Sequence, residues 1–375
     1  MIEASAVAAP GVVVPVREAR TTGWDIRTLE QSKAWRFVLE PSAALELLRV
    51  VRKVTTAEKS LLSYRRSDFP IAHLLDVFHA AMAEVTDGLG IALISGLPRQ
   101  DVSESEFSLM TWAIGLHLGV ARPQDRHTAY LNKVKDIGTD YRSPTGRGYS
   151  SNAKLDFHVD GSDVVLLSCF NQAPEGGMSI CTSSIRAYQV LCEERPDLAP
   201  AMKELFPFSR NGEHQADESA WFMAPLVGEQ DGLRFVAWNR NRLVNALKLE
   251  HVPPITALQW EAVGYFDGLL RRPDLMYATM LKPGDLQILN NQTTLHSRTA
   301  FVDSKREDEK RTLYRLWLAV PNSRRLPPMW EHYAGTRQEA TVRGGSRGFK
   351  YDDACREFDR AQAAVSGMKL PEFLI

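Results

Sequence analysis

The stretch LDFHVDG, residues 155–161, places a histidine and a carboxylate two positions apart within an apolar run. In an extended strand, side chains at positions i and i+2 leave the same face, about 7 Å apart along the backbone. His158 and Asp160 can therefore bind one metal ion together. Such a pair occurs often by chance, so a further ligand is needed before the stretch indicates a metal site.

A candidate third ligand lies far downstream. His296 stands in NNQTTLHSRT, residues 290–299, after a Pro-Gly-Asp turn and an apolar run typical of a strand. Two histidines and one carboxylate on one side of a metal leave its other side open, which is the arrangement of non-haem Fe(II) oxygenases. Catalytic zinc sites use similar ligands, so the ligand set alone does not exclude zinc.

Three other residues compete for these roles. Asp163 lies five positions after His158, which places it on the opposite face of a straight strand. His214 and His251 have no partner pattern around them. We expect these two histidines to be exposed or to have their hydrogen bonds satisfied.

Composition limits the class of protein. The 375 residues suffice for one large domain or two ordinary ones, and 44% hydrophobic with 24% charged residues predicts a globular core. The net charge of -1 gives no general reason to bind nucleic acid or an anionic membrane. Four cysteines without a CxxC pair favour a reduced, cytoplasmic protein, and no apolar run is long enough to span a membrane. Nothing in the sequence indicates the oligomeric state.

Periodicity predicts helices first and strands later. Apolar residues recur at helical spacing in 41–54, 71–87 and 103–118, and Ser103 with Glu106 forms a capping box for the last of these. Short strands gather after residue 130, with helices before and between them. We therefore predict a mainly β protein with surrounding helices, either a β-sandwich or a jelly roll.

One segment is too long for an ordinary connection. Residues 121–151 are polar and rich in glycine, arginine and aspartate, so they form a candidate lid or substrate loop. Within them, residues 130–134 can form a strand.

Four blocks together resemble the taurine dioxygenase and clavaminate synthase-like family of Fe(II)/2-oxoglutarate-dependent oxygenases. These blocks are HVDG, PEGGMS, LKPGDLQILNNQTTLHSRTAF and KRTLYRLWLAVP, and their order matches over roughly residues 130–321. The resemblance implies a double-stranded β-helix core, jelly-roll and cupin-like, with the metal at one mouth. It divides a single catalytic domain, 1–375, into helical N-terminal support (1–120), the candidate lid (121–151), the β core (152–325) with a helical insert (184–275), and a C-terminal extension (326–375).

The resemblance also assigns roles. His158, Asp160 and His296 would bind the iron, and Arg311 would bind the distal carboxylate of 2-oxoglutarate. The physical argument agrees, because a guanidinium binds a carboxylate through two charge-assisted hydrogen bonds. The alternative is that Arg311 belongs to the charged, solvated run at 306–311 and has no role in binding.

Further contacts are expected from hydroxyls and arginines near these residues. Ser179 occupies the position where relatives place a hydroxyl on the 2-oxoglutarate carboxylate, and Thr182 is an alternative for the same role. Arg315 shares the strand face of Arg311, and the matching arginine in relatives lies nearer the iron and contacts the prime substrate or the keto acid. Arg298, two residues beyond His296, can point into the pocket or lie on the surface.

The expected function is oxidation of an aliphatic C–H bond with Fe(II), 2-oxoglutarate and O2, releasing succinate and CO2. Hydroxylation is the default, with desaturation or cyclisation open. Because Arg315 and Arg298 favour an anion, we expect a small, anionic metabolite or natural-product intermediate. A metal-dependent hydrolase or isomerase on a cupin-like scaffold, and a non-catalytic small-molecule-binding protein, remain alternatives.

Overall fold

The computed structural model describes residues 23–55, 59–139 and 148–374. Its largest sheet has the strand order β1-β2-β13-β5-β16-β3, and β4 pairs with β16 as well. All pairings in this sheet are antiparallel except the parallel β1–β2 pair. The strands are β1 (Arg36–Val38), β2 (Ile91–Ser95), β3 (Val120–Arg122), β4 (Leu131–Val134), β5 (Val164–Asn171), β13 (Leu286–Asn290) and β16 (Thr312–Ala319).

A smaller antiparallel sheet lies against the inner face of the large one. Cys181 from the small sheet shares a buried cluster with Val165, Leu289 and Trp317 from the large sheet. Two packed antiparallel sheets of this kind form a jelly roll, as the sequence predicts. The small sheet has the order β12-β7-β14, with β12 (Met276–Thr279), β7 (Ser179–Ser183) and β14 (Thr294–Arg298), and β6 (Glu175–Gly176) pairs with β15 (Phe301–Val302) beside it.

Strand β16 shows how the alternating sequence builds two different faces. Leu316 and Leu318 pack into the outer core beneath the N-terminal helices, together with Phe107. Arg315 and Trp317 alternate with them and line an interior cavity. One strand therefore supplies both the packing of the helical layer and the wall of the pocket.

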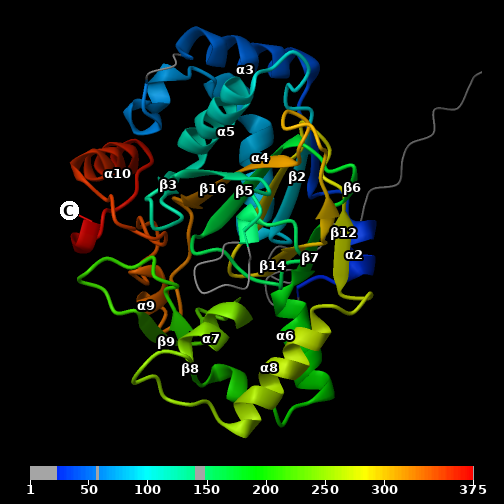
Figure 1. The fold of residues 1–375 in the computed structure, drawn as a ribbon, viewed down its shortest axis with the longest axis vertical. Coiled ribbons are helices and arrows are strands. Elements are labelled where there is room, and N and C mark those ends of the chain that lie inside the picture. The colour runs from blue at the N-terminus through cyan, green and yellow to red at the C-terminus, as the bar shows by residue number, and fades with distance from the viewer. Residues whose placement is uncertain (1–22, 56–58, 140–147, 375) are drawn as a thin grey trace, which may run out of the picture.

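Helices cover the outer face of the large sheet at the top of Figure 1. The predicted capping box is confirmed, because Ser103 Oγ accepts from Glu106 N at 3.2 Å and Glu106 Oε2 accepts from Ser103 N at 2.7 Å. The N-terminal helices are α2 (Ile26–Gln31), α3 (Pro41–Val54), α4 (Asp76–Asp87) and α5 (Glu104–Leu118), with 3-10 turns η1 (Leu61–Ser63), η2 (Arg66–Asp68) and η3 (Ala72–Leu74).

The insert between β7 and β12 packs around its own buried cluster in the lower half of Figure 1. It is mixed rather than helical, because two hairpins lie between its helices. Its elements are α6 (Ser184–Glu194), η5 (Ala201–Lys203), β8 (Leu205–Ser209), β9 (Trp221–Pro225), β10 (Val227–Gln230), β11 (Leu233–Val236), α7 (Arg240–Ala246) and α8 (Ala257–Leu269).

The C-terminal extension returns to the β core. It contains α9 (Glu331–Ala334), α10 (Asp353–Val365) and η6 (Glu372–Leu374), and α10 lies at the side of the sheet near β3 (Figure 1). All four cysteines are free. Within the described ranges, no helix combines the length and apolarity needed to cross a membrane.

Two expectations need correction. The N-terminal region is not only helical, since β1 and β2 belong to the large sheet. The candidate lid also contains sheet, because β3 and the predicted strand β4 pair with β16, and η4 (Gly148–Ser150) closes the segment. Its residues 140–147 lie outside the described residues.

Candidate active site

The backbone brings the two histidines together directly. His158 and His296 form a β-bridge in which each N–H donates to the other carbonyl at 3.0 Å. His296 belongs to β14, whereas the predicted strand around His158 is reduced to single bridges with His296 and Asn239. The segment is extended but lacks a continuous ladder, because it crosses between the small sheet and the insert.

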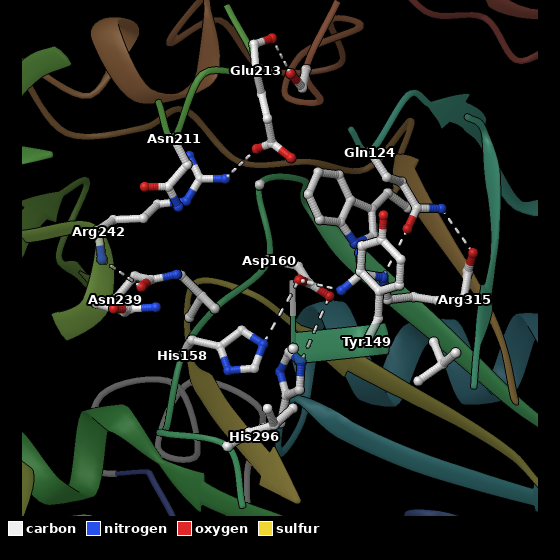
Figure 2. A pocket seen from close by; sticks show the side chains of 18 of the residues that line it. Gln124, Tyr149, His158, Asp160, Asn211, Glu213, Asn239, Arg242, His296 and Arg315 are labelled. Atoms are coloured by element: carbon white, nitrogen blue, oxygen red, sulfur yellow. Dashed lines mark hydrogen bonds and ion pairs between the residues drawn. The ribbon is translucent and has the colours of Figure 1, made fainter. Parts of the chain in front are cut away.

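The side chains of His158, Asp160 and His296 converge on one point (Figure 2). One ligand atom from each lies within 4.8 Å of the others. The Nε2 atom of His158 lies 4.0 Å from Asp160 Oδ1, and that of His296 lies 3.6 Å from Asp160 Oδ2. Asn291 fixes the backbone of Asp160, because its Oδ1 accepts from the Asp160 N–H at 3.1 Å.

The donor set fits a divalent metal. His158 Nδ1 donates to the Asp156 carbonyl at 2.9 Å, which leaves Nε2 with a lone pair directed at the ligand cluster. Asp160 Oδ2 is buried and accepts no hydrogen bond within the described part of the chain. A cation between the carboxylate and the two Nε2 atoms would satisfy all three groups.

Burial sets the protonation of these ligands. Burial lowers the pKa of His296 to about 3, with the neighbouring His158 acting in the same direction. Burial also lowers the pKa of His158. Burial alone would raise the pKa of Asp160, but Arg315 and then the two histidines lower it overall. Two neutral imidazoles and a carboxylate are the forms that bind metal.

Arg311 lies buried in the same cavity. Its Nη2 donates to the Gly177 carbonyl at 3.4 Å, while its buried Nη1 has no hydrogen-bond partner among the described residues. Burial lowers its pKa to about 10. Gly177 has a φ of +74°, and a Cβ there would lie 2.8 Å from Arg311 Nε, which explains the second glycine of PEGGMS.

The two candidate hydroxyls lie on opposite faces of β7. Ser179 lines the cavity, and its Oγ donates to Gln287 Oε1 at 2.7 Å. Thr182 is three positions on, so it faces the opposite side of the strand, where its Oγ1 donates to the Leu270 carbonyl at 3.0 Å. The structure therefore does not bring Thr182 to the cavity.

The side chain of Arg298 is hydrogen-bonded to the protein backbone. Although it lines the cavity, its Nη2 donates to the carbonyls of Ser151 at 2.7 Å and Ala153 at 2.6 Å. Its guanidinium packs over the Phe301 ring at 4.7 Å. These hydrogen bonds hold the segment before His158 in place. They give no support for the expected contact between Arg298 and the substrate.

Arg315 contacts the ligand cluster itself. Its Nη1 lies 3.2 Å from Asp160 Oδ1, and its Nε donates to Gln124 Oε1 at 2.8 Å (Figure 2). Gln124 is buried and also donates to the carbonyls of Tyr130 and Arg315. Sequence analysis missed Gln124, because nothing in the local pattern connects it with a strand 191 residues away.

The opposite side of the cavity comes from the insert. Asn211, Glu213 and Arg242 lie across the cavity from the metal ligands, whereas Asn239 lies next to His158, with which its backbone forms a bridge (Figure 2). His214 also lines this side, and its buried Nδ1 has no partner in the described part of the chain, so the expectation of an exposed or satisfied histidine was wrong. No sequence motif marked these residues. The cavity measures about 200 Å³.

Fold and site together define a jelly-roll protein with a metal centre of two histidines and one carboxylate. The family model described as taurine catabolism dioxygenase TauD, TfdA family matches residues 53–317. The chain belongs to this family and is an Fe(II)/2-oxoglutarate-dependent oxygenase. Fe(II), 2-oxoglutarate and O2 are its cofactor and cosubstrates, which decides against the hydrolase and the non-catalytic binding protein.

Two curated relatives are similar in sequence. FR-33289 synthase from Streptomyces rubellomurinus is 26% identical over 310 residues, covering 81% of this chain and 91% of that protein. The taurine hydroxylase-like protein SAT17 from Stachybotrys chartarum is 28% identical over 262 residues, covering 65% of this chain and 66% of that protein.

Solved structures share the fold. An asparagine oxygenase in complex with Fe(II), 2S,3S-3-hydroxyasparagine and succinate superposes with a TM-score of 0.54 at 20% identity, covering 76% of this chain and 93% of that chain. The non-haem iron oxygenase OrfP in complex with Fe and alpha-ketoglutaric acid superposes with a TM-score of 0.56 at 16% identity, covering 76% and 94%. At these identities the likeness establishes the jelly-roll fold.

Proposed function

We propose that this enzyme hydroxylates an aliphatic C–H bond of a small metabolite or natural-product intermediate, with His158, Asp160 and His296 as the iron ligands. One observation carries the proposal: the three ligand side chains converge in a cavity that also holds a buried nitrogen of Arg311 with no hydrogen-bond partner among the described residues. Desaturation or ring closure at the same site requires only a different position of the substrate.

The reactive chemistry belongs to the bound group: Fe(II) with 2-oxoglutarate and O2 supplies the oxidation and yields succinate and CO2. The protein supplies position and charge. The Nδ1 hydrogen bond of His158 fixes its ring so that Nε2 faces the metal side. Arg315, held by Gln124, keeps Asp160 ionised, because a cation beside a carboxylate favours its charged form.

Arg311 is the proposed anchor for 2-oxoglutarate. Its guanidinium is buried, and no carboxylate of the described residues lies within ion-pair distance of it. A keto acid with a carboxylate at its far end provides the missing anion, and Ser179 on β7 of the small sheet offers a hydroxyl that lines the same cavity. Arg315 remains a candidate for contact with the substrate, because it also lines the cavity.

The size of the cavity supports a small substrate. About 200 Å³ accommodates a metabolite rather than a folded macromolecule. The molecules named in complexes of the structural neighbours, hydroxyasparagine and hydroxy-arginine, are likewise small. We retain the cytoplasmic location expected from the cysteine content as part of this proposal.

Anaerobic titration tests the assignment. Fe(II) and 2-oxoglutarate together should produce a visible charge-transfer band, and His158→Ala should abolish it. Arg311→Leu should weaken 2-oxoglutarate binding by about 10- to 100-fold, the equivalent of about 1.5–3 kcal/mol for a charge-assisted hydrogen bond.

Arg306→Leu is the matched control. Arg306 lies five positions earlier, and its side chain is 67% exposed, so 2-oxoglutarate affinity should not change. Unaltered affinity in Arg311→Leu would remove Arg311 from the site. Absence of the band in the unmodified protein would contradict the proposed iron and keto-acid assignment as a whole.

A further inference from the structure

One wall of the cavity is polar and comes from the insert. We call it the hairpin wall: it comprises the connection from β8 to β9 and the start of α7. Asn211, Glu213 and Arg242 of this wall lie across the cavity from the metal ligands (Figure 2). Its charged or ionisable members that line the cavity are Arg210, Glu213, His214, Glu218 and Arg242.

Both carboxylates of the hairpin wall that line the cavity already have a cationic partner. Glu213 Oε2 lies 2.9 Å from Arg242 Nη2. Glu218 Oε1 lies 3.3 Å from Arg347 Nη2, and its Oε2 accepts from Gln215 N at 2.8 Å. Glu218 also acts on Arg210 from beyond ion-pair distance: burial, the larger effect, lowers the pKa of Arg210, while Glu218 raises it.

Arg210 lacks such a partner. No carboxylate of the described residues lies within 4.0 Å of its guanidinium, which packs over the Phe222 ring at 4.8 Å and donates from Nη2 to the His332 carbonyl at 3.1 Å. Its Nε is buried without a hydrogen bond in the described ranges. Burial of an unpaired charge is costly, so this arrangement is incomplete without an anion.

His214 adds a second unused polar atom four positions later. Its buried Nδ1 has no partner among the described residues. Phe208, Phe222 and Trp238 line the cavity alongside these groups. The cavity thus offers cationic and hydrogen-bonding groups next to an apolar surface.

We propose that Arg210 and His214 form an anion subsite that binds an acidic group of the substrate, away from the carbon that is oxidised. The inference rests on the proposed function for its claim that the ligand is the substrate. The class of substrate is a small apolar chain bearing an oxyanion. Carboxylate, phosphonate and sulfonate share the chemistry that a guanidinium recognises, and the experiment separates them.

Titration calorimetry on the enzyme loaded anaerobically with Fe(II) and 2-oxoglutarate provides the test. The keto acid occupies Arg311, so added acids report on the remaining cavity. The probes are pentanoate, butylphosphonate, butanesulfonate and the uncharged pentanamide. At least one acid should bind about 10-fold more tightly than the amide, as one charge-assisted hydrogen bond implies.

Single substitutions then test whether Arg210 and His214 cause the preference for acids over pentanamide. Arg210→Met should bind the acids no better than pentanamide, Arg210→Lys should retain part of the preference, and His214→Leu should reduce it. Arg240→Met is the matched control, because Arg240 stands at the start of α7 with its side chain 43% exposed and does not line the cavity. Circular dichroism checks that each variant is folded.

Equal affinity for the acids and the amide in the unmodified protein overturns the inference, as does undetectable binding of every acid. A preference that survives in Arg210→Met also overturns it. Repeating the comparison with metal-free protein separates this result from the proposed function. Arg311 is then also open to the acids, so the measured quantity is the loss of acid affinity from the unmodified protein to Arg210→Met, which does not depend on iron or keto acid.

Discussion

Burial of the two imidazoles governs how the site takes up metal. A histidine with an ordinary pKa near 6.5 is protonated in mildly acidic solution, and the proton competes with the metal. Burial lowers the pKa of His296 to about 3, with a further contribution from His158, whose own pKa is also lowered by burial. The His296 ring is therefore neutral well below the pH at which a solvated histidine becomes charged, and the His158 ring also stays neutral to a lower pH than a solvated histidine.

The affinity for metal should accordingly change little between about pH 7.5 and pH 6, by less than about threefold. Protons compete with the metal only at pH values below the pKa of each histidine in the folded protein. Because both pKa values are lowered, the affinity for metal falls only at pH values below this range. Co(II) binding followed by absorbance at several pH values measures this. A loss of about 10-fold across the same range would show that at least one imidazole titrates as it does in water.

Among individual residues, the sequence predicts the metal ligands better than the side chains that hold them in position. The pair at His158 and Asp160 and the distant His296 follow from residue type and spacing, and the structure brings all three together. Thr182 was misplaced because a hydroxyl in a β-like run does not reveal which face it occupies until the register is known. Gln124 was missed because its contact with Arg315 depends on the pairing of two distant segments.

Between elements, buried ion pairs connect the C-terminal extension to the β core. Arg343 Nε lies 2.7 Å from Asp163 Oδ1, and both side chains are almost fully buried, at 1% and 3% exposure. Asp163 immediately precedes β5 and also accepts from the Val320 N–H. Beside this pair, the Gly345 N–H donates to the Gly161 carbonyl at 2.6 Å, so the extension lies directly over the turn that follows Asp160.

Arg343→Met should lower the free energy of unfolding by about 3–5 kcal/mol, because it leaves the Asp163 carboxylate buried without its cation. Urea denaturation measures the change. Arg306→Met is the control, because the Arg306–Asp308 pair is exposed to solvent and its loss should leave the free energy of unfolding almost unchanged. Equal effects of the two substitutions would mean that water reaches Asp163 in the folded protein.

The sequence predicted the type of an element where apolar residues recur regularly over many positions. The helix expected at 41–54 and the strand expected within 130–134 are present as α3 and β4. The short strands β1 and β2 were not assigned to the sheet, because three to five residues carry too little periodic signal to show where they pair.

For the whole molecule, the contacts join regions that are far apart in sequence. Arg122 Nη1 and Asp359 Oδ2 form a buried pair at 2.6 Å, which links β3 to α10 across 237 residues. Strands from the N-terminal region lie at the edge of the large sheet, and the C-terminal extension lies over the metal side. These links favour the predicted single catalytic domain, whose parts depend on one another for stability.

The metal-free protein should therefore unfold in one cooperative transition in urea. Far-UV circular dichroism and tryptophan fluorescence should give coincident curves, because Trp112, Trp238 and Trp330 report from the helical layer, the insert and the C-terminal extension. Arg343→Met should move the whole curve to lower urea without dividing it. Adding Fe(II) and 2-oxoglutarate at about 100 times their dissociation constants should stabilise the fold by about 2.7 kcal/mol per saturated site. An early fluorescence transition that leaves most of the circular dichroism signal intact would show that the insert or the extension unfolds as a separate unit.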